Sequence, residues 1–296
     1  MLIGYMLSII SSLFFTIYIL PRKISKQKPI YYTMFVGLGY SIISIIMYIG
    51  NQLVGNSKEV IYHPILLVSA FAGFSWMLGQ LLLVTAIDKI GLSRSNQWKN
   101  LQGPIGSILI LIFFQESIST NLVFLFSAIA MIFVSAMLFT IKRDDEVIID
   151  KKGIIYAIVS ALFFGTNAWL RKYVTAEGFV YAQQLYGSIA VFITALIYIV
   201  IKDRNGKELL NLKDKNNYLA IVGGSIYYFA SYFFVLAYNY IQGSIAFTIV
   251  QLNAVWTVLV GILVFKEMNF KKNWLRISAG IIVAIIGVVM LLFAQK

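Results

Sequence analysis

The chain of 296 residues contains no cysteine, one histidine and four prolines. Without cysteine it forms no disulfide, thiolate nucleophile or cysteine-ligated metal site, and His63 alone cannot build a multi-histidine site. No G-x-x-x-x-G-K-[ST] motif is present, so the chain lacks this phosphate-binding loop for ATP. A membrane-embedded enzyme needs a buried catalytic acid, a histidine cluster or a metal. These absences therefore argue against an enzyme and against a resident metal or cofactor.

Charged residues are also scarce, at 12%, while 60% of the residues are hydrophobic. This composition lies far outside the range of soluble domains and indicates an integral membrane protein. None of the 12 acids falls in the centre of an apolar segment. An antiporter that exchanges a cationic drug for a proton needs such a buried carboxylate, so polyspecific cation export is disfavoured.

Apolar segments long enough to cross a bilayer, roughly 20 residues each, follow one another along the whole chain. We predict an all-α membrane protein with ten transmembrane helices. The predicted segments are residues 2–20, 31–50, 64–87, 92–114, 121–141, 153–171, 179–201, 217–240, 243–265 and 273–294. The N-terminus lacks the basic region and the small-residue cleavage site of a signal peptide, so we expect the first segment to remain in the mature chain.

The net charge of +12 follows this topology and does not indicate a nucleic acid partner. Nineteen of the 24 basic residues fall in one set of alternating connections, and Lys99 lies inside a segment. The opposite connections carry only Lys58, Arg171, Lys172 and Lys296. The positive-inside rule places the richer side in the cytoplasm, so we predict a multi-pass protein of the cell membrane with both termini outside.

The sequence also repeats itself once. At an offset of 151 residues, Ile90 to Gln102 align with Ile241 to Asn253, and Phe114-Gln-Glu116 aligns with Phe265-Lys-Glu267. At an offset of 149, Phe14, Phe15, Arg22 and Lys23 meet Phe163, Phe164, Arg171 and Lys172. Since each copy holds five helices, we predict two inverted repeats, at residues 1–141 and 153–296, joined by a cytoplasmic linker at 142–152. This architecture is typical of secondary transporters with a site near the bilayer midplane.

The fourth segment holds the most unusual residues. Pro104 follows Gly103 in mid-span, where proline removes a backbone hydrogen bond, so we expect a broken helix that lines a cavity. Lys99 lies about 10 Å into the same span if the helix starts near Leu92. Either its side chain snorkels to the cytoplasmic surface or its ammonium faces the cavity and contacts substrate. Glu116 and Glu267, aligned at the ends of two segments, are expected to make helix-end hydrogen bonds.

Amide side chains occur at aligned positions of the two copies. Asn100-Leu-Gln102 aligns with Gln251-Leu-Asn253, and residues two apart on a helix point about 200° apart. One amide of each triplet should therefore face the cavity. The stripe Ser95, Lys99, Gln102 and Gly106 favours Gln102, and alignment then favours Asn253 and Thr257. The alternative is that these amides only form hydrogen bonds between neighbouring helices.

The remaining candidates are polar or aromatic residues within the predicted spans. Those assigned to substrate binding are Asn96, Trp76, Gln80, Asn167, Trp169, Tyr227, Gln251 and Trp256, with Ser231 and Tyr232 as further polar positions. An aromatic face beside amide groups suits a sugar, a nucleobase or an aromatic amino acid. Tryptophan and tyrosine are also common as interfacial anchors, which is the alternative for each of them.

The whole pattern resembles the drug/metabolite transporter superfamily, with ten helices in two inverted repeats and a Phe113-Phe-Gln-Glu116 or Phe265-Lys-Glu267 end to the fourth helix of each. Within it, Gly79-Gln80 and Ile90-Gly-Leu-Ser-Arg94 look like the bacterial glucose/ribose porter group, related to rhamnose-proton symporters. The resemblance implies sugar uptake with protons and a cavity lined by helices 1, 3, 4, 6, 8 and 9. Residues 95–100 depart from the more apolar helix start of the sugar members.

Two transport hypotheses follow. The preferred one is a secondary active transporter that takes up a small polar metabolite, most of all a glucose-like or ribose-like sugar, with protons by alternating access. The alternative is an exporter or exchanger of amino acids or other carboxylated metabolites, with Lys99 as the carboxylate partner. A scaffold or receptor subunit would have no use for an inverted duplication.

Overall fold

The computed structural model describes residues 1–296 except 56–57, 139–149, 203–213, 266–269 and 295–296, and the described residues form helices without strands. The elements are α1 (Leu2–Ile17), α2 (Leu20–Ile24), α3 (Pro29–Val54), α4 (Leu66–Ile90), α5 (Leu92–Lys99), α6 (Gln102–Phe113), the short 3-10 helix η1 (Glu116–Ile118), α7 (Leu122–Leu138), α8 (Lys151–Ala176), α9 (Tyr181–Lys202), α10 (Lys215–Ala237), α11 (Gly243–Val250), α12 (Asn253–Leu263) and α13 (Phe270–Leu292).

Eight stretches of the described chain are helical, long and apolar enough to cross a membrane. They are Leu2–Ile24, Pro29–Val54, Leu66–Ile90, Lys151–Ala176, Tyr181–Lys202, Lys215–Ala237, Gly243–Gly261 and Trp274–Leu292. Two further predicted segments correspond to helices shorter than these eight. Segment 92–114 is divided into α5 and α6, and segment 121–141 contains α7. The prediction of an all-helical membrane protein is confirmed at this level.

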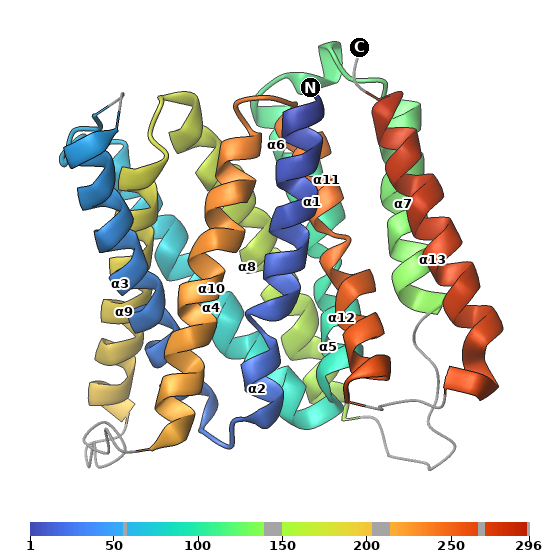
Figure 1. Ribbon diagram of the computed structural model, residues 1–296, viewed down its shortest axis with the longest axis horizontal. Helices are drawn as coiled ribbons and strands as arrows, with labels where there is room; N and C mark the ends of the chain where they lie inside the picture. Colours follow the sequence, from blue (N-terminus) through green and yellow to red (C-terminus); the bar gives the residue numbers. More distant parts are fainter. Residues whose placement is uncertain (56–57, 139–149, 203–213, 266–269, 295–296) are drawn as a thin grey trace.

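The helices form one bundle in which successive elements run up and down (Figure 1). Helix α8 packs against α4 and α6, and α10 packs against α1 and α3. Helices α7 and α13 pair with each other at one side of the bundle, and the start of α1 and the end of α13 lie at the same end (Figure 1). Large apolar side chains such as Ile46, Ile155 and Ile282 are exposed on the outside, as expected for a surface that faces lipid.

Small residues allow a very close helix contact between α3 and α10. A Cβ atom added to Gly39 would lie 2.0 Å from the carbonyl oxygen of Ile221, and one added to Gly224 would lie 1.9 Å from that of Val36. Neither position has room for a side chain. Both glycines are therefore packing residues that let the two helix backbones approach closely in lipid.

Two buried or half-buried carboxylates satisfy helix N-termini at one end of the bundle. Glu116 accepts hydrogen bonds from the backbone N–H groups of Gly243 and Ser244, at 2.8 and 3.0 Å, where α11 begins. Glu59 does the same for the first N–H groups of α9, including Ala182 at 2.7 Å. The helix-end role predicted for Glu116 is confirmed, although the helix belongs to the other half. Glu267 lies outside the described residues.

Two predicted boundaries need correction. The sixth segment was expected to end at residue 171, but α8 continues to Ala176, so Arg171 and Lys172 belong to a helix and not to a loop. The predicted linker at 142–152 falls mostly outside the described residues. Its last part begins α8, where the Asp150 side chain accepts a hydrogen bond from the N–H of Lys152 at 2.8 Å and caps the helix.

Candidate functional site

A cavity lies inside the bundle where the interrupted helices meet the long ones. Its walls come from α1 and the turn after it, α4, α5, α6, α8, α10, α11 and α12, which correspond to the predicted helices 1, 3, 4, 6, 8 and 9. The lining residues are Phe15, Tyr18, Trp76, Lys99, Gln102, Phe164, Asn167, Ala168, Arg171, Tyr227, Ser231, Phe234, Phe247, Val250 and Asn253. All of these except Phe15 are buried.

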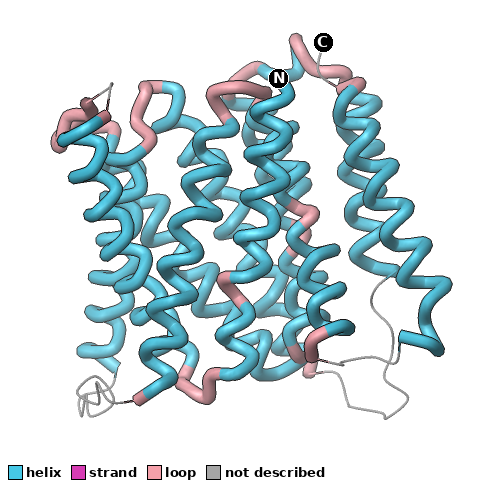
Figure 2. The backbone as a smooth tube through the Cα atoms, viewed as in Figure 1, coloured by secondary structure: helices cyan, strands magenta, loops and turns pink. Residues whose placement is uncertain are grey.

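Two helix interruptions shape this cavity, and the one between α11 and α12 is visible in the middle of the bundle (Figure 2). Helix α5 ends at Lys99 and α6 begins at Gln102, while α11 ends at Val250 and α12 begins at Asn253. The interruptions therefore fall at positions that align at the offset of 151 residues. Each one places an amide side chain, Gln102 or Asn253, at the first position of the next helix.

The backbone at the two interruptions follows one hydrogen-bonding pattern. In the first, the Asn100 carbonyl accepts from the N–H of Gly103 at 3.0 Å. In the second, the Gln251 carbonyl accepts from the N–H of Ala254 at 3.1 Å. Both are bonds between residues three apart, which tighten the chain relative to an α-helix. Pro104 lacks the N–H that an α-helical Asn100 carbonyl would use, so it favours the first interruption.

Lys99 lies on one side of the cavity and is 5% exposed. Its Nζ is 3.5 Å from Oδ1 of Asn96 and 3.5 Å from Oδ1 of Asn253, and it lies 5.6 Å from the centroid of the Phe164 ring. These oxygen distances are longer than the 2.7–3.2 Å typical of an N–H···O hydrogen bond. The ammonium therefore faces the cavity with weak protein contacts, and it does not snorkel to the surface.

The amides divide into one set that faces the cavity and one set behind it. Gln102 and Asn253 line the cavity, whereas Asn100 and Gln251 line a smaller pocket on the other side of α6. Nε2 of Gln102 also donates to Oε1 of Gln251 at 2.9 Å, so this amide links the two interruptions. Asn253 donates through Nδ2 to the carbonyl of Val250 at 2.7 Å.

Aromatic rings form a continuous wall of the cavity. The Tyr227 ring lies 4.4 Å from the Trp76 ring and 5.1 Å from the Tyr18 ring, between centroids. Phe15 packs on the same ring at 5.6 Å. Tyr18 donates its hydroxyl hydrogen to Oε1 of Gln80 at 3.1 Å, which fixes the ring orientation. The wall offers flat apolar faces beside hydroxyl and amide groups.

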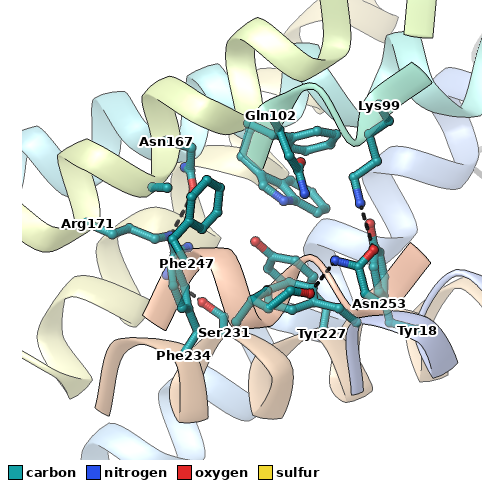
Figure 3. Close-up of a pocket in the computed structure, with 15 residues that line it drawn as sticks. Tyr18, Lys99, Gln102, Asn167, Arg171, Tyr227, Ser231, Phe234, Phe247 and Asn253 are labelled. Atoms are coloured by element: carbon teal, nitrogen blue, oxygen red, sulfur yellow. Dashed lines mark hydrogen bonds between the residues drawn. The ribbon is translucent and has the colours of Figure 1, made fainter. Parts of the chain in front are cut away.

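Arg171 lies on the side of the cavity opposite Lys99 (Figure 3). Its guanidinium is 4% exposed and is held by neutral acceptors only among the described residues. Nε donates to Oδ1 of Asn167 and Nη1 to Oε1 of Gln184, each at 3.0 Å. Nη2 donates to the Tyr40 hydroxyl at 2.9 Å, and Nη1 also donates to Oγ of Ser231.

The described part of the chain places no carboxylate in this cavity. Its six acids are Glu59, Asp88, Glu116, Asp150, Glu177 and Asp214, and each of them lies in a connection, at a helix cap or in a last helical turn. The prediction that acids avoid mid-span positions is confirmed for these residues. The cavity therefore combines two cationic side chains with neutral polar and aromatic ones.

The open space inside the cavity is small. The space open to the centre of a water-sized sphere is about 40 Å³. One ordered water molecule needs roughly 10–15 Å³ by this measure, so the space holds a few water molecules. A ligand the size of a monosaccharide must therefore displace some of the lining side chains.

The structure brings together most of the residues that the sequence marked as candidates. The seven that line the cavity are Lys99, Gln102, Asn253, Trp76, Asn167, Tyr227 and Ser231. Gln251 and Gln80 stand directly behind it and hydrogen-bond to lining residues, and Oδ1 of Asn96 lies 3.5 Å from Nζ of Lys99. Trp169 and Trp256 lie away from it.

Trp169 and Trp256 each have another packing partner. Trp169 packs against the ring of Phe113 at 4.6 Å, and Nε1 of Trp256 donates to Oγ of Ser12 at 3.0 Å. Thr257, expected beside Asn253, also does not line the cavity, because its hydroxyl donates to the carbonyl of Asn253 at 2.6 Å.

Arg171 is the main lining residue that the sequence analysis assigned elsewhere. The predicted span ended at this arginine because charged residues usually mark the end of an apolar segment. A signal was present, since Asn167 lies four residues earlier and such spacing puts both side chains on one helical face. Phe15 and Phe164, which align at the offset of 149 residues, both line the cavity, whereas Tyr18, Phe234 and Phe247 carry no sequence signal that separates them from the other aromatic residues of the spans.

Comparison with known proteins identifies the family. The sequence profile described as "Sugar transport protein" matches residues 6–294. A protein of Priestia megaterium named as a probable glucose uptake protein is 24% identical over 241 residues, covering 77% of this chain and 79% of that protein. A protein of Latilactobacillus sakei named for ribose uptake is 23% identical over 225 residues, covering 73% and 74%.

One solved crystal structure shares the fold, with a TM-score of 0.74 at 11% identity and coverage of 99% of this chain and 96% of the other. The resemblance to the glucose/ribose porter group is thus confirmed by a match that spans nearly the whole chain. The matching family consists of transporters and not of enzymes. The chain belongs to the sugar transport protein family.

Proposed function

We propose that the protein is a secondary active transporter that takes up a monosaccharide across the cell membrane. The observation that carries the proposal is the buried polar and aromatic cavity at the two helix interruptions. Aromatic faces pack on the apolar faces of a sugar ring, and amides bond to its hydroxyls. The relatives named for glucose and ribose uptake support a sugar of this size.

The proposed topology has ten spans in two inverted repeats of five. Two findings support it: the interruptions fall at aligned positions, and α1 begins where α13 ends (Figure 1). An even number of crossings returns the chain to its starting side. The distribution of basic residues then places both termini outside the cell. With inverted repeats, the cavity opens alternately to the two sides of the membrane.

Substrate binding is assigned to the residues that line the cavity and to those directly behind them. Gln102 and Asn253 approach from opposite halves of the chain, and Trp76 and Tyr227 supply the aromatic wall. Proton coupling is assigned to Lys99. Of the two cavity cations, arginine stays protonated in proteins while a lysine ammonium can release its proton.

Export or exchange of amino acids or other carboxylated metabolites is the second candidate. The buried ammonium of Lys99 favours it, because this group can pair with a carboxylate. The two candidates differ in the direction of transport and in whether the substrate is a sugar.

Uptake into liposomes tests the proposal. We expect purified protein to accumulate radiolabelled glucose or ribose when the lumen is more alkaline than the medium, and a protonophore to abolish the accumulation. Trp76→Phe should reduce uptake because Trp76 lines the cavity, whereas the control Trp169→Phe should retain it because Trp169 packs outside. Folded protein that transports amino acids but no sugar would refute the proposed function.

A further inference from the structure

The charges of the cavity do not match a neutral sugar. Lys99 and Arg171 line it on opposite sides, and its fifteen lining residues include no acid (Figure 3). A buried cation without a counter-ion is costly, because burial removes its hydration and nothing of opposite charge replaces it. Two such cations in one small cavity also repel each other. An anion bound between Lys99 and Arg171 would therefore be stabilised by both charges.

The two cations differ in how far the protein satisfies them. Arg171 uses four of its five N–H donors on Asn167, Gln184, Ser231 and Tyr40. Its guanidinium is thus fixed in place by neutral dipoles. Its charge still acts across the cavity, but few of its donors remain for a ligand.

Lys99 is the cation whose N–H donors remain available to a ligand. Its ammonium carries three N–H bonds, and its oxygen contacts to Asn96 and Asn253 are both 3.5 Å long. Asn96 Nδ2, on the neighbouring turn, has no hydrogen-bond partner in the described structure although it is buried. An ammonium that faces the cavity without close partners can bind an oxygen anion, and the unpartnered amide donor of Asn96 lies behind it.

A comparison of the two halves of the chain shows how the excess positive charge in the cavity arises. Arg22, aligned with Arg171, forms an ion pair with Asp88. The position aligned with Asp88 at the offset of 151 is Asn239, so the second half lacks this acid. Lys99 in turn aligns with Val250, so the first half has gained a cation. Both differences from strict symmetry leave positive charge in the cavity.

We propose that the substrate is an acidic sugar, a monosaccharide that carries a carboxylate. The carboxylate pairs with Lys99, and the hydroxyls bond to Gln102 and Asn253. Arg171 adds a fixed positive field from the other side. A carboxylate fits better than a phosphate because Lys99 is the one cation here with free donors, whereas the three oxygens of a phosphate would need more donors than it has. This inference rests on the proposed function and narrows its substrate class.

Titration calorimetry on the purified wild-type protein provides the test, with glucose against glucuronate and galactose against galacturonate. The members of each pair differ only in the oxidation of C6 to a carboxylate. We expect the acid to bind at least about tenfold more tightly than its neutral partner, which corresponds to about 1.4 kcal/mol. Lys99→Gln should remove this preference.

Lys172→Gln is the matched control. Lys172 follows Arg171 on α8 and is also half-buried, but its Nζ points to Glu116 at 3.9 Å and not into the cavity. This variant should keep the preference for the acid. The affinity for glucose 6-phosphate, measured in the same way, tells whether the site prefers a carboxylate or a phosphate.

The outcomes distinguish the inference from the function on which it rests. Neutral sugars that bind as tightly as the acids, or a preference that survives Lys99→Gln, would overturn the inference and leave sugar transport intact. Tighter binding of glucose 6-phosphate than of glucuronate would overturn the assignment of a carboxylate. Failure of folded protein to bind any sugar in the panel would overturn both proposals.

Discussion

Replacement of Gly39 by alanine should destabilise the bundle at the close contact between α3 and α10. The new Cβ would lie 2.0 Å from the Ile221 carbonyl oxygen, whereas Cβ contacts under 3.0 Å essentially do not occur. Because the obstructing atom belongs to the backbone of α10, no rotamer change relieves the clash. Helices α3 and α10 must separate by about 1 Å, and overpacking of this kind costs about 1–3 kcal/mol.

Gly50 on the same helix is the matched control. A Cβ added there meets nothing within 4 Å. Gly50→Ala should therefore leave stability unchanged or raise it by about 0.5–1 kcal/mol, because alanine loses less conformational entropy in a helix. The two variants make the same chemical change and differ in the space around it.

Thermal unfolding of detergent-purified protein measures both effects. The two variants should differ by about 1–4 kcal/mol, and each kcal/mol shifts the midpoint of a large domain by roughly 2–4 °C, so we expect Gly39→Ala to melt about 2–16 °C lower than Gly50→Ala. The reasoning is refuted if the two variants melt at the same temperature. It is also refuted if Gly39→Ala melts above the wild type, because α3 and α10 would then have room that the structure denies.

Three further predictions concern buried polar groups, each read out by thermal unfolding without added sugar. Glu116→Gln should lower stability by about 1–2 kcal/mol, because the neutral amide accepts less strongly from the N-terminus of α11; an unchanged melting temperature would contradict this. Lys99→Met should raise the melting temperature, since it removes a buried charge without a counter-ion, and a decrease would show that the charge is satisfied. Gln102→Leu should cost about 1–3 kcal/mol, because Oε1 of Gln251 loses its donor, and Gln102→Leu combined with Gln251→Leu should recover part of the loss.

The helices were predictable because lipid leaves few alternatives. Every backbone polar group in a bilayer must be bonded within the protein, so a long apolar run becomes a helix. The same reasoning placed the end of the sixth segment too early. Hydropathy treats Arg171 as the limit of the span, whereas in α8 its donors bond to Asn167 and other polar groups that the tertiary fold brings together. Contacts between distant segments are not visible in a hydropathy pattern.

The site was partly predictable from helical geometry alone. The 200° separation of residues two apart distinguished Gln102 from Asn100, and alignment carried the same choice to Asn253. The same geometry does not tell which tryptophans face the cavity and which pack elsewhere. Trp76 faces the cavity and Trp256 donates to Ser12 behind it, although both lie well inside their helices. Which side of a fully apolar helix faces inward depends on the neighbours it packs against.

The cause of the interruption between α5 and α6 is open to a direct test. The same interruption forms between α11 and α12, where Val255 stands at the position aligned with Pro104. Proline is therefore not required for the geometry, and the hydrogen bond from Gln102 to Gln251 ties the two interruptions together without it. Pro104→Val should keep the affinity for the best sugar of the binding panel within about twofold, since about 0.4 kcal/mol is a small change for a cavity whose walls stay in place. A folded Pro104→Val protein that has lost sugar binding would show that proline, and not packing, holds α5 and α6 apart.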